Sequence, residues 1–279
     1  MLFDAHNHLQ DEWLAPHLDT IVPVLTDLGV GGAVVNGTHP EDWPRVAALA
    51  ARFPWIRPSY GVHPWQCGRR PADWKDQFEA RLIANPHACV GEIGLDRWIL
   101  ENARKDDPRL VDTVRAPLDE QSEVFRWQLN WAGQHNRAAT IHCLQAWGPL
   151  LDVLQTTARP ERGFLLHAYG GSLEVARQCL ELGACFSFNP SFLDPRKTRQ
   201  REVFCALPLE RLLVETDAPA LPPPPERTRF TLPDSANGCR VAHPGNLGLA
   251  YAALAELRGV PEQQLQEQVA ENFRRLFGP

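Results

Sequence analysis

The sequence predicts an α/β chain folded as a (β/α)8 TIM barrel. Short apolar runs recur about eight times, beginning near residues 2, 32, 56, 88, 138, 163, 184 and 211. The intervals of roughly 20 to 50 residues suit a strand followed by its crossover helix. Runs such as 33–35 and 212–214 lack polar alternation, which is typical of strands buried on both faces. An open doubly wound sheet is the alternative, but it usually has fewer repeats and a glycine-rich first turn, which the A-H-N-H of residues 5–8 does not provide.

Amphipathic helices are predicted between these runs. Leu247, Ala250, Tyr251 and Leu254 follow the spacing of one helix face. The last helix is expected to start after Pro261, because proline favours the beginning of a helix. Its apolar face repeats the same spacing at Leu265, Val269, Phe273 and Leu276.

Two long connections, residues 97–118 and 219–246, follow the fourth and eighth predicted strands. The first is heavily charged, and the second contains four consecutive prolines. In a barrel both connections lie on the face where the strands end, and long loops there usually shape a substrate site. The whole chain, residues 1–279, is expected to form a single catalytic barrel domain.

Composition excludes several classes of protein. The chain has 279 residues, of which 44% are hydrophobic and 22% charged, as in ordinary globular proteins. A net charge of -6 argues against holding nucleic acid by bulk charge, although bound metal can still make a local positive site. No run of 18 apolar residues indicates a membrane span, and the first residues do not resemble a secretory signal. The seven cysteines form no C-x-x-C pair and are interpreted as reduced thiols, so a cytoplasmic location is predicted.

Polar side chains follow most of the predicted strands directly. The first strand ends in H-x-H, which puts two imidazoles on one face because strand residues alternate. A barrel brings all of the strand ends to one mouth, so these side chains are expected to converge. The other five histidines, at positions 17, 39, 87, 135 and 243, are interpreted as surface residues. The candidate site residues are His6, His8, His63, Glu92, His142, His167 and Asp217.

Four of these histidines and the two carboxylates exceed what one tetrahedral metal needs. They suit two divalent metal ions that share a bridging carboxylate, a pair that activates water and stabilises a displacement reaction. Oxygen and nitrogen ligands without thiolate fit Zn, Mn, Mg, Co or Ni, and the sequence does not choose among them. Cys143 adjoins His142, but alternation turns its side chain to the opposite face, where it is expected to pack.

The order of motifs resembles the TatD family of metal-dependent hydrolases, a branch of the amidohydrolase-like TIM barrels. The motifs are D-x-H-x-H, G-V-H-P, G-E-I-G-L-D, I-H-C, L-x-H and E-T-D-A-P. The resemblance covers essentially the whole chain, from residue 2 to about residue 277. It implies phosphodiester hydrolysis, typically deoxyribonuclease action of 3′-to-5′ exonuclease character, with DNA or another phosphodiester as a transient substrate and no membrane or obligate protein partner.

The resemblance also implies the roles of single residues. Asp217 would take the proton from the attacking water, Glu92 would bridge both metals, and His63 would contact the scissile phosphate or lie just outside the metal shell. The implied ligands are His6, His8 and Asp217 for the first metal, His142 and His167 for the second, and Glu92 for both.

Several positions around the ligands depart from the family pattern. Leu144 and Gln145 stand where members commonly have an arginine and an acidic residue, and Arg97 stands where an aromatic residue is usual. Ala168 departs from the usual H-C-F-S-G, and Ala242 from the usual N-E-P. The metal ligands are kept while much of the expected substrate shell is not.

Substrate contacts are expected from three side chains near the mouth. Arg97 could bind phosphate, Trp65 could stack on a base, and Tyr169 could point into the mouth. The altered substrate shell keeps a second hypothesis open, a hydrolase of the same fold acting on a carboxylic ester, lactone or amide. A third hypothesis is an interaction module of low activity that holds metal. Its only support is the proline-rich segment 219–246, which could dock a partner as an extended polyproline stretch.

Overall fold

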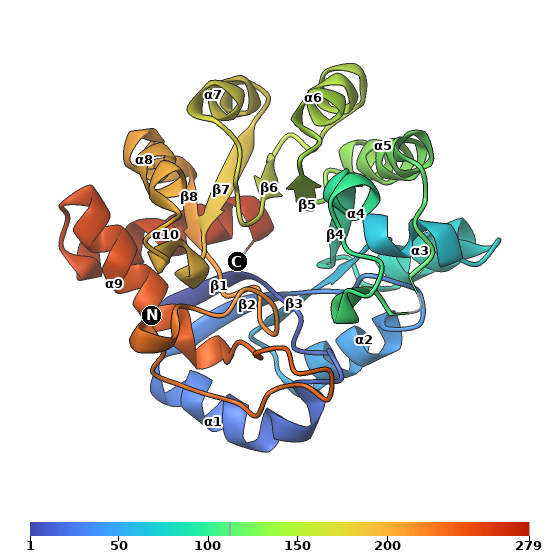
Figure 1. Cartoon of the computed structure of the whole chain (residues 1–279). Coiled ribbons are helices and arrows are strands. Elements are labelled where there is room, and N and C mark those ends of the chain that lie inside the picture. Colours follow the sequence, from blue (N-terminus) through green and yellow to red (C-terminus); the bar gives the residue numbers. More distant parts are fainter. Residues whose placement is uncertain (112, 279) are drawn as a thin grey trace.

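The computed structural model describes residues 1–111 and 113–278 of the chain, and its eight strands form one parallel sheet in the order β1 to β8. Figure 1 shows the helices arranged around these strands. Each strand begins within two residues of a predicted apolar run, so the predicted TIM barrel is confirmed. The strands are β1 Leu2–Asn7, β2 Val30–Asn36, β3 Ile56–Tyr60, β4 Cys89–Asp96, β5 Ala139–Leu144, β6 Phe164–Leu166, β7 Ala184–Phe188 and β8 Leu212–Val214.

Helices alternate with the strands, and short 3-10 turns lie mainly in the connections. The α-helices are α1 Leu18–Asp27, α2 Trp43–Arg52, α3 Trp74–Ala84, α4 Trp98–Glu101, α5 Leu118–Gln134, α6 Trp147–Thr156, α7 Leu173–Glu181, α8 Thr198–Ala206, α9 Leu247–Arg258 and α10 Glu262–Phe277. The 3-10 turns are η1 Ala15–His17, η2 Pro64–Arg69, η3 Pro108–Leu110, η4 Pro190–Leu193, η5 Leu209–Arg211, η6 Pro225–Arg227 and η7 Pro244–Asn246.

The core fills the space inside the barrel and between the strands and the helices. Phe164 and Phe186 are buried on neighbouring strands that pair with each other. The predicted apolar faces of α9 and α10 are also buried. Burying a side chain of this size contributes roughly 1.5–3 kcal/mol each, so the apolar pattern holds the helices against the barrel.

Residues that follow β8 hold β1 where the barrel closes. The Tyr251 hydroxyl of α9 accepts a hydrogen bond from Phe3 N at 2.9 Å and donates one to Phe3 O at 3.0 Å. Asp4, the next residue of β1, accepts bonds from the Thr216 hydroxyl at 2.6 Å and from Thr216 N at 3.0 Å. Asp217 N donates to His6 O at 2.9 Å. These bonds fix the first strand against the segment that follows the last one.

The two long connections meet each other. Residues 97–118 contain α4 and η3, and position 112 lies outside the described residues. Residues 219–246 contain η6 and η7, and the Asn237 side chain donates a hydrogen bond to Pro108 O at 3.2 Å. Among the described residues, no helix is both long and apolar enough to span a membrane.

Candidate metal centre

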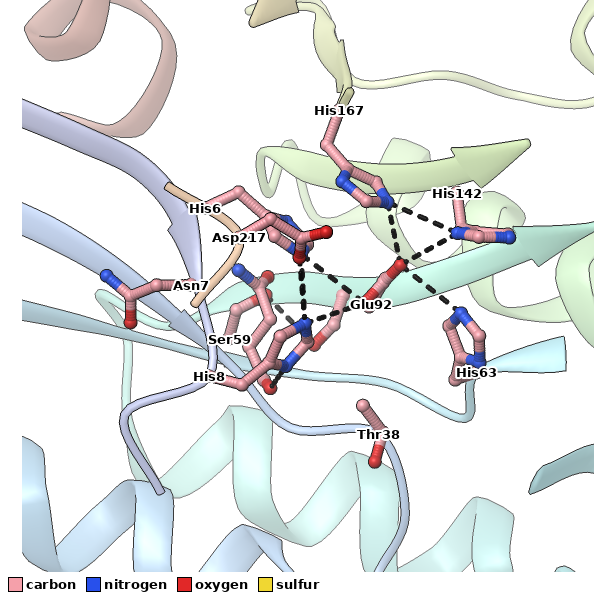
Figure 2. Close-up of polar contacts among 12 residues, drawn as sticks. His6, Asn7, His8, Thr38, Ser59, His63, Glu92, His142, His167 and Asp217 are labelled. Atoms are coloured by element: carbon pink, nitrogen blue, oxygen red, sulfur yellow. Dashed lines mark hydrogen bonds and ion pairs between the residues drawn. The ribbon is translucent and has the colours of Figure 1, made fainter. Parts of the chain in front are cut away.

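The seven predicted site residues converge at the carboxyl ends of the strands. Figure 2 shows Glu92 surrounded by imidazoles, with Asp217 beside His6. The first two histidines lie at the end of β1 and just beyond it, and the others lie on or just after five further strands. Five imidazole nitrogens lie within 3.3 Å of a Glu92 oxygen, from His6, His8, His63, His142 and His167.

A first group of ligands has the spacing of a tetrahedral metal site. Glu92 Oε2 lies 3.3 Å from His6 Nε2 and 3.3 Å from His8 Nε2. Asp217 Oδ1 lies 3.5 Å and 3.4 Å from the same two nitrogens, which are 3.2 Å apart. A tetrahedron with metal–ligand bonds of 2.0–2.1 Å has edges of about 3.3–3.4 Å. Five of the six edges between these four atoms are therefore close to those of a tetrahedral site, so the four side chains can surround one divalent ion.

A second group uses the other oxygen of the same carboxylate. Glu92 Oε1 lies 2.8 Å from His167 Nε2 and 3.2 Å from His142 Nδ1, and the two nitrogens are 3.2 Å apart. These atoms form a triangle that matches one face of a ligand tetrahedron and leaves room for a further ligand. Since each oxygen of Glu92 faces one group, the arrangement fits a carboxylate that bridges two ions.

Glycines in the G-E-I-G motif let Glu92 reach this position. A side chain at Gly94, which has a φ of 141°, would put its Cβ 2.0 Å from His142 O. A Cβ at Gly91 would lie 2.9 Å from Thr140 O. Only glycine allows so close an approach of β4 to β5, which carries His142. The Gly91–Glu92 and Ala218–Pro219 peptide bonds are cis.

For His8 and His63, a hydrogen bond on the far side of the ring decides which nitrogen faces the site. His8 Nδ1 lies 2.8 Å from Asn36 O, and a carbonyl only accepts, so the lone pair of neutral His8 is on Nε2 and faces the first group. His63 is reversed, because its Nδ1 accepts a bond from Trp65 N at 3.2 Å. Neutral His63 therefore carries its proton on Nε2 and presents a donor where His8 presents a ligand.

The charges of the site stabilise one another. Burial would raise the pKa of the Glu92 carboxyl, but the neighbouring His63, His167 and His6 hold that pKa well below its ordinary value. Burial would lower the pKa of His8, but hydrogen bonds to Asp217 and Glu92 raise it well above the ordinary value. The carboxylates thus attract positive charge, and a dication must displace protons to bind, so binding should weaken as the pH falls.

Three buried carboxylates behind the ligands were not predicted from the sequence. Asp96 Oδ2 lies 3.1 Å from His142 Nε2, Glu215 Oε1 lies 3.8 Å from His167 Nδ1, and Asp4 joins β1 to the segment after β8. Of the three, Asp96 lies within hydrogen-bond distance of a histidine ring, and carboxylates commonly orient ligand histidines in this way. Asp96 follows Glu92 by four residues, which puts both on one face of a strand, and this spacing could have indicated it.

The three predicted substrate contacts have different surroundings. The Arg97 side chain is 37% exposed, with its guanidinium 3.9 Å from Glu101. Trp65 is half-buried, and its Nε1 donates a hydrogen bond to Asp96 at 2.6 Å. Tyr169 does not point into the mouth as expected, because it is 1% exposed and its hydroxyl donates to Ser172 O at 2.8 Å. Arg97 is therefore the most accessible of the three.

The prediction that five histidines lie on the surface is wrong for two of them. His39 and His243 are each 6% exposed. Each caps a turn, since His39 Nδ1 accepts a bond from Glu41 N at 3.3 Å and His243 Nδ1 accepts one from Gly245 N at 2.8 Å. Loop residues carry no periodic pattern from which such burial could be predicted.

Three of the positions that depart from the family pattern, Arg97, Leu144 and Gln145, lie together at a rim beside His142. Leu144 is an exposed apolar side chain at the end of β5, with 37% of its surface accessible. Gln145 has a φ of 57° and accepts a hydrogen bond from Asn102 at 2.8 Å. Leu144 O accepts a bond from Arg97 N at 2.9 Å. The rim is therefore held by uncharged hydrogen bonds.

Known proteins resemble this chain along almost its whole length. Residues 3–278 match the family model described as TatD related DNase. The chain is 26% identical to an uncharacterized metal-dependent hydrolase, YabD, of Bacillus subtilis, and the match covers 99% of both chains. It is 27% identical to the 3'-5' ssDNA/RNA exonuclease TatD of Citrobacter koseri, again over 99% of both. The crystal structure of YjjV, a TatD homolog from Escherichia coli, superposes with a TM-score of 0.83 at 25% identity, covering all of this chain and 98% of that one.

Proposed function

The chain belongs to the TatD related DNase family and is a metal-dependent hydrolase, and we propose that it cleaves phosphodiester bonds in DNA as a 3′-to-5′ exonuclease. The observation that carries this proposal is the pair of ligand groups that share the two oxygens of Glu92. Two dications held side by side suit phosphodiester cleavage, because together they activate water and neutralise charge on the attacking and leaving oxygens. Zn, Mg, Mn, Co and Ni all fit these ligands.

Under this proposal the chain holds the two ions through six residues. One group would bind the first ion, the other would bind the second, and Glu92 would belong to both. This assignment is supported by the distances within each group, which match those between the ligands of a tetrahedral ion. The first group is His6, His8, Asp217 and Glu92, and the second is His142, His167 and Glu92.

Asp217 would accept the proton of the attacking water. Its carboxylate is buried at the mouth, and the hydrogen bond from His8 and the charge of His167 lower its pKa against the effect of burial, so it is ionised and holds no proton of its own. One carboxylate oxygen faces His6 and His8, which leaves the other oxygen for the water.

His63 would act from the opposite side as a donor. Its Nδ1 is already used as an acceptor, so Nε2 carries the proton, and Nε2 lies 3.3 Å from Glu92 Oε1. With Glu92 engaged by the ions, this N–H would be free to stabilise negative charge on a phosphate oxygen. Arg97 is proposed as a further phosphate contact on the rim.

The decisive experiment follows the cleavage of end-labelled single-stranded DNA. Metal-free protein resupplied with Mg or Mn should give a ladder of shortened products, and Asp217→Asn should reduce the rate by at least about 100-fold, as for loss of a general base. Asp106→Asn, a fully exposed loop position, is the matched control and should keep the full rate. Cleavage by Asp217→Asn at the wild-type rate would rule out the general-base role.

A second candidate is hydrolysis of a small ester, lactone or amide at the same centre. Exposed Leu144 favours it, since an apolar rim offers little to a phosphate backbone. Protein that holds two ions but leaves DNA intact in every metal would select this candidate.

We also propose a cytoplasmic location. The seven cysteines are all free thiols, which is usual in a reducing compartment.

A further inference from the structure

Asp96 occupies a buried position behind the second ligand group. It ends β4, it is 0% exposed, and its Oδ2 lies 3.1 Å from His142 Nε2. Its backbone is fixed as well, because the Gln121 side chain accepts from Asp96 N at 2.8 Å and donates to Asp96 O at 3.2 Å. The carboxylate therefore has little freedom to turn away from His142.

Both oxygens of Asp96 meet donors only. Oδ1 accepts a hydrogen bond from Ile99 N at 2.9 Å, and Oδ2 accepts one from Trp65 Nε1 at 2.6 Å. An ionised carboxylate can only accept hydrogen bonds, so the third atom in contact with Asp96, His142 Nε2, must be a donor as well. The proton of neutral His142 is then on Nε2, and the lone pair on Nδ1 faces Glu92 and His167.

The same carboxylate joins this ring to the connection 97–118. Ile99 belongs to α4, the first turn of that connection. Trp65 stacks on Trp98 with ring centroids 6.2 Å apart, and the Arg109 guanidinium lies 4.9 Å above the Trp98 ring. A contiguous path thus runs from the connection through Trp65 to His142.

We propose that Asp96 is a positioning residue that fixes the tautomer of His142 and thereby sets the affinity of the second ligand group for its ion. The inference rests on the proposed ligand role of His142 and does not depend on the substrate. An asparagine has one oxygen and one NH2 group where Asp96 has two oxygens. Its NH2 group would therefore face one of the donors that Asp96 now accepts from. If that donor is His142 Nε2, the imidazole must shift its proton to Nδ1 and lose its ligand lone pair.

The test measures Zn2+ binding by the metal-free full-length chain in competition with a chelator. Asp96→Asn should bind the second ion about 10–100-fold more weakly, as is typical when the partner of a ligand histidine is lost, and should bind the first ion as wild type does. Asp106→Asn removes the same charge from the connection that follows β4, away from the ligand groups, and should leave both affinities unchanged. Excess Zn2+ should restore the second ion to Asp96→Asn, which would not happen if the variant were merely misfolded.

A second measurement uses only the wild-type chain. The side-chain 15N spectrum of the Zn2+-loaded protein should show the His142 proton on Nε2. A proton on Nδ1, or equal affinities for both ions in Asp96→Asn and wild type, would overturn the proposal. Suppose that the wild-type chain fails to cleave DNA while Asp96→Asn still binds the second Zn2+ ion more weakly than wild type. In that case the proposed function fails and the role of Asp96 stands.

Discussion

Tyr251→Phe should destabilise the barrel at the junction where α9 holds β1. Tyr251 is fully buried, and its hydroxyl serves both Phe3 N and Phe3 O. Phenylalanine keeps the ring but leaves one backbone donor and one acceptor without a partner. Each unpaired buried group costs about 1–3 kcal/mol, so for two groups the free energy of unfolding should fall by about 2–6 kcal/mol. For a chain of this size the Tm should fall by roughly 5–10 °C.

The measurement is thermal unfolding of the metal-free variant followed by circular dichroism. Tyr169→Phe is the matched control, since its hydroxyl makes a single bond, to Ser172 O, away from the junction. That control should lose only about 0.5–1.5 kcal/mol. Equal Tm values for Tyr251→Phe and wild type would refute the reasoning that these two bonds hold the first strand in place.

Three further predictions concern the ions, the rim and pH. Glu92→Ala should remove the bridge between the ligand groups, so elemental analysis should find fewer than two ions per chain; two tightly bound ions would exclude the bridging role. Arg97→Ala should raise the KM for DNA several-fold at unchanged kcat if its guanidinium binds phosphate, and an unchanged KM would make it a surface residue. Burial lowers the pKa of His243 to about 4, so its protonation opposes folding, and about 3 kcal/mol of stability present above pH 6.5 should be lost as the pH falls toward 4. In His243→Asn, which can still cap the turn, the free energy of unfolding measured by urea titration should fall less between about pH 6.5 and pH 4 than in wild type. An equal fall in both proteins would contradict the assignment.

The sequence carried enough information for the barrel and for the convergence of its site. Strand positions could be predicted because buried parallel strands are continuous apolar runs, and the ends of such strands in a barrel meet at one mouth. His6 and His167 are 161 positions apart, yet their rings stack at 3.9 Å, as that convergence requires. Predicting this convergence required only the order of the strands along the chain.

Side-chain directions were harder to predict, because they depend on contacts that no local pattern encodes. Tyr169 follows a ligand histidine by two residues, but it packs inward against Trp147 and Phe186. His243 is buried by residues such as Phe230, whose ring stacks on it at 5.3 Å. Both contacts join segments whose relative placement is fixed only after the whole barrel has formed.

The arrangement of the centre also separates chemistry from substrate recognition. The ligand groups are built from residues inside the mouth, and their spacing depends on Glu92 and on the close approach of β4 to β5. On the rim, Leu144, Gln145 and Asn102 carry no charge, and Arg97 supplies a positive one. Changes on the rim can therefore alter which ester enters without moving the ligands. It follows that metal binding should survive substitution of Leu144 by arginine, while the preference for DNA over small esters should increase.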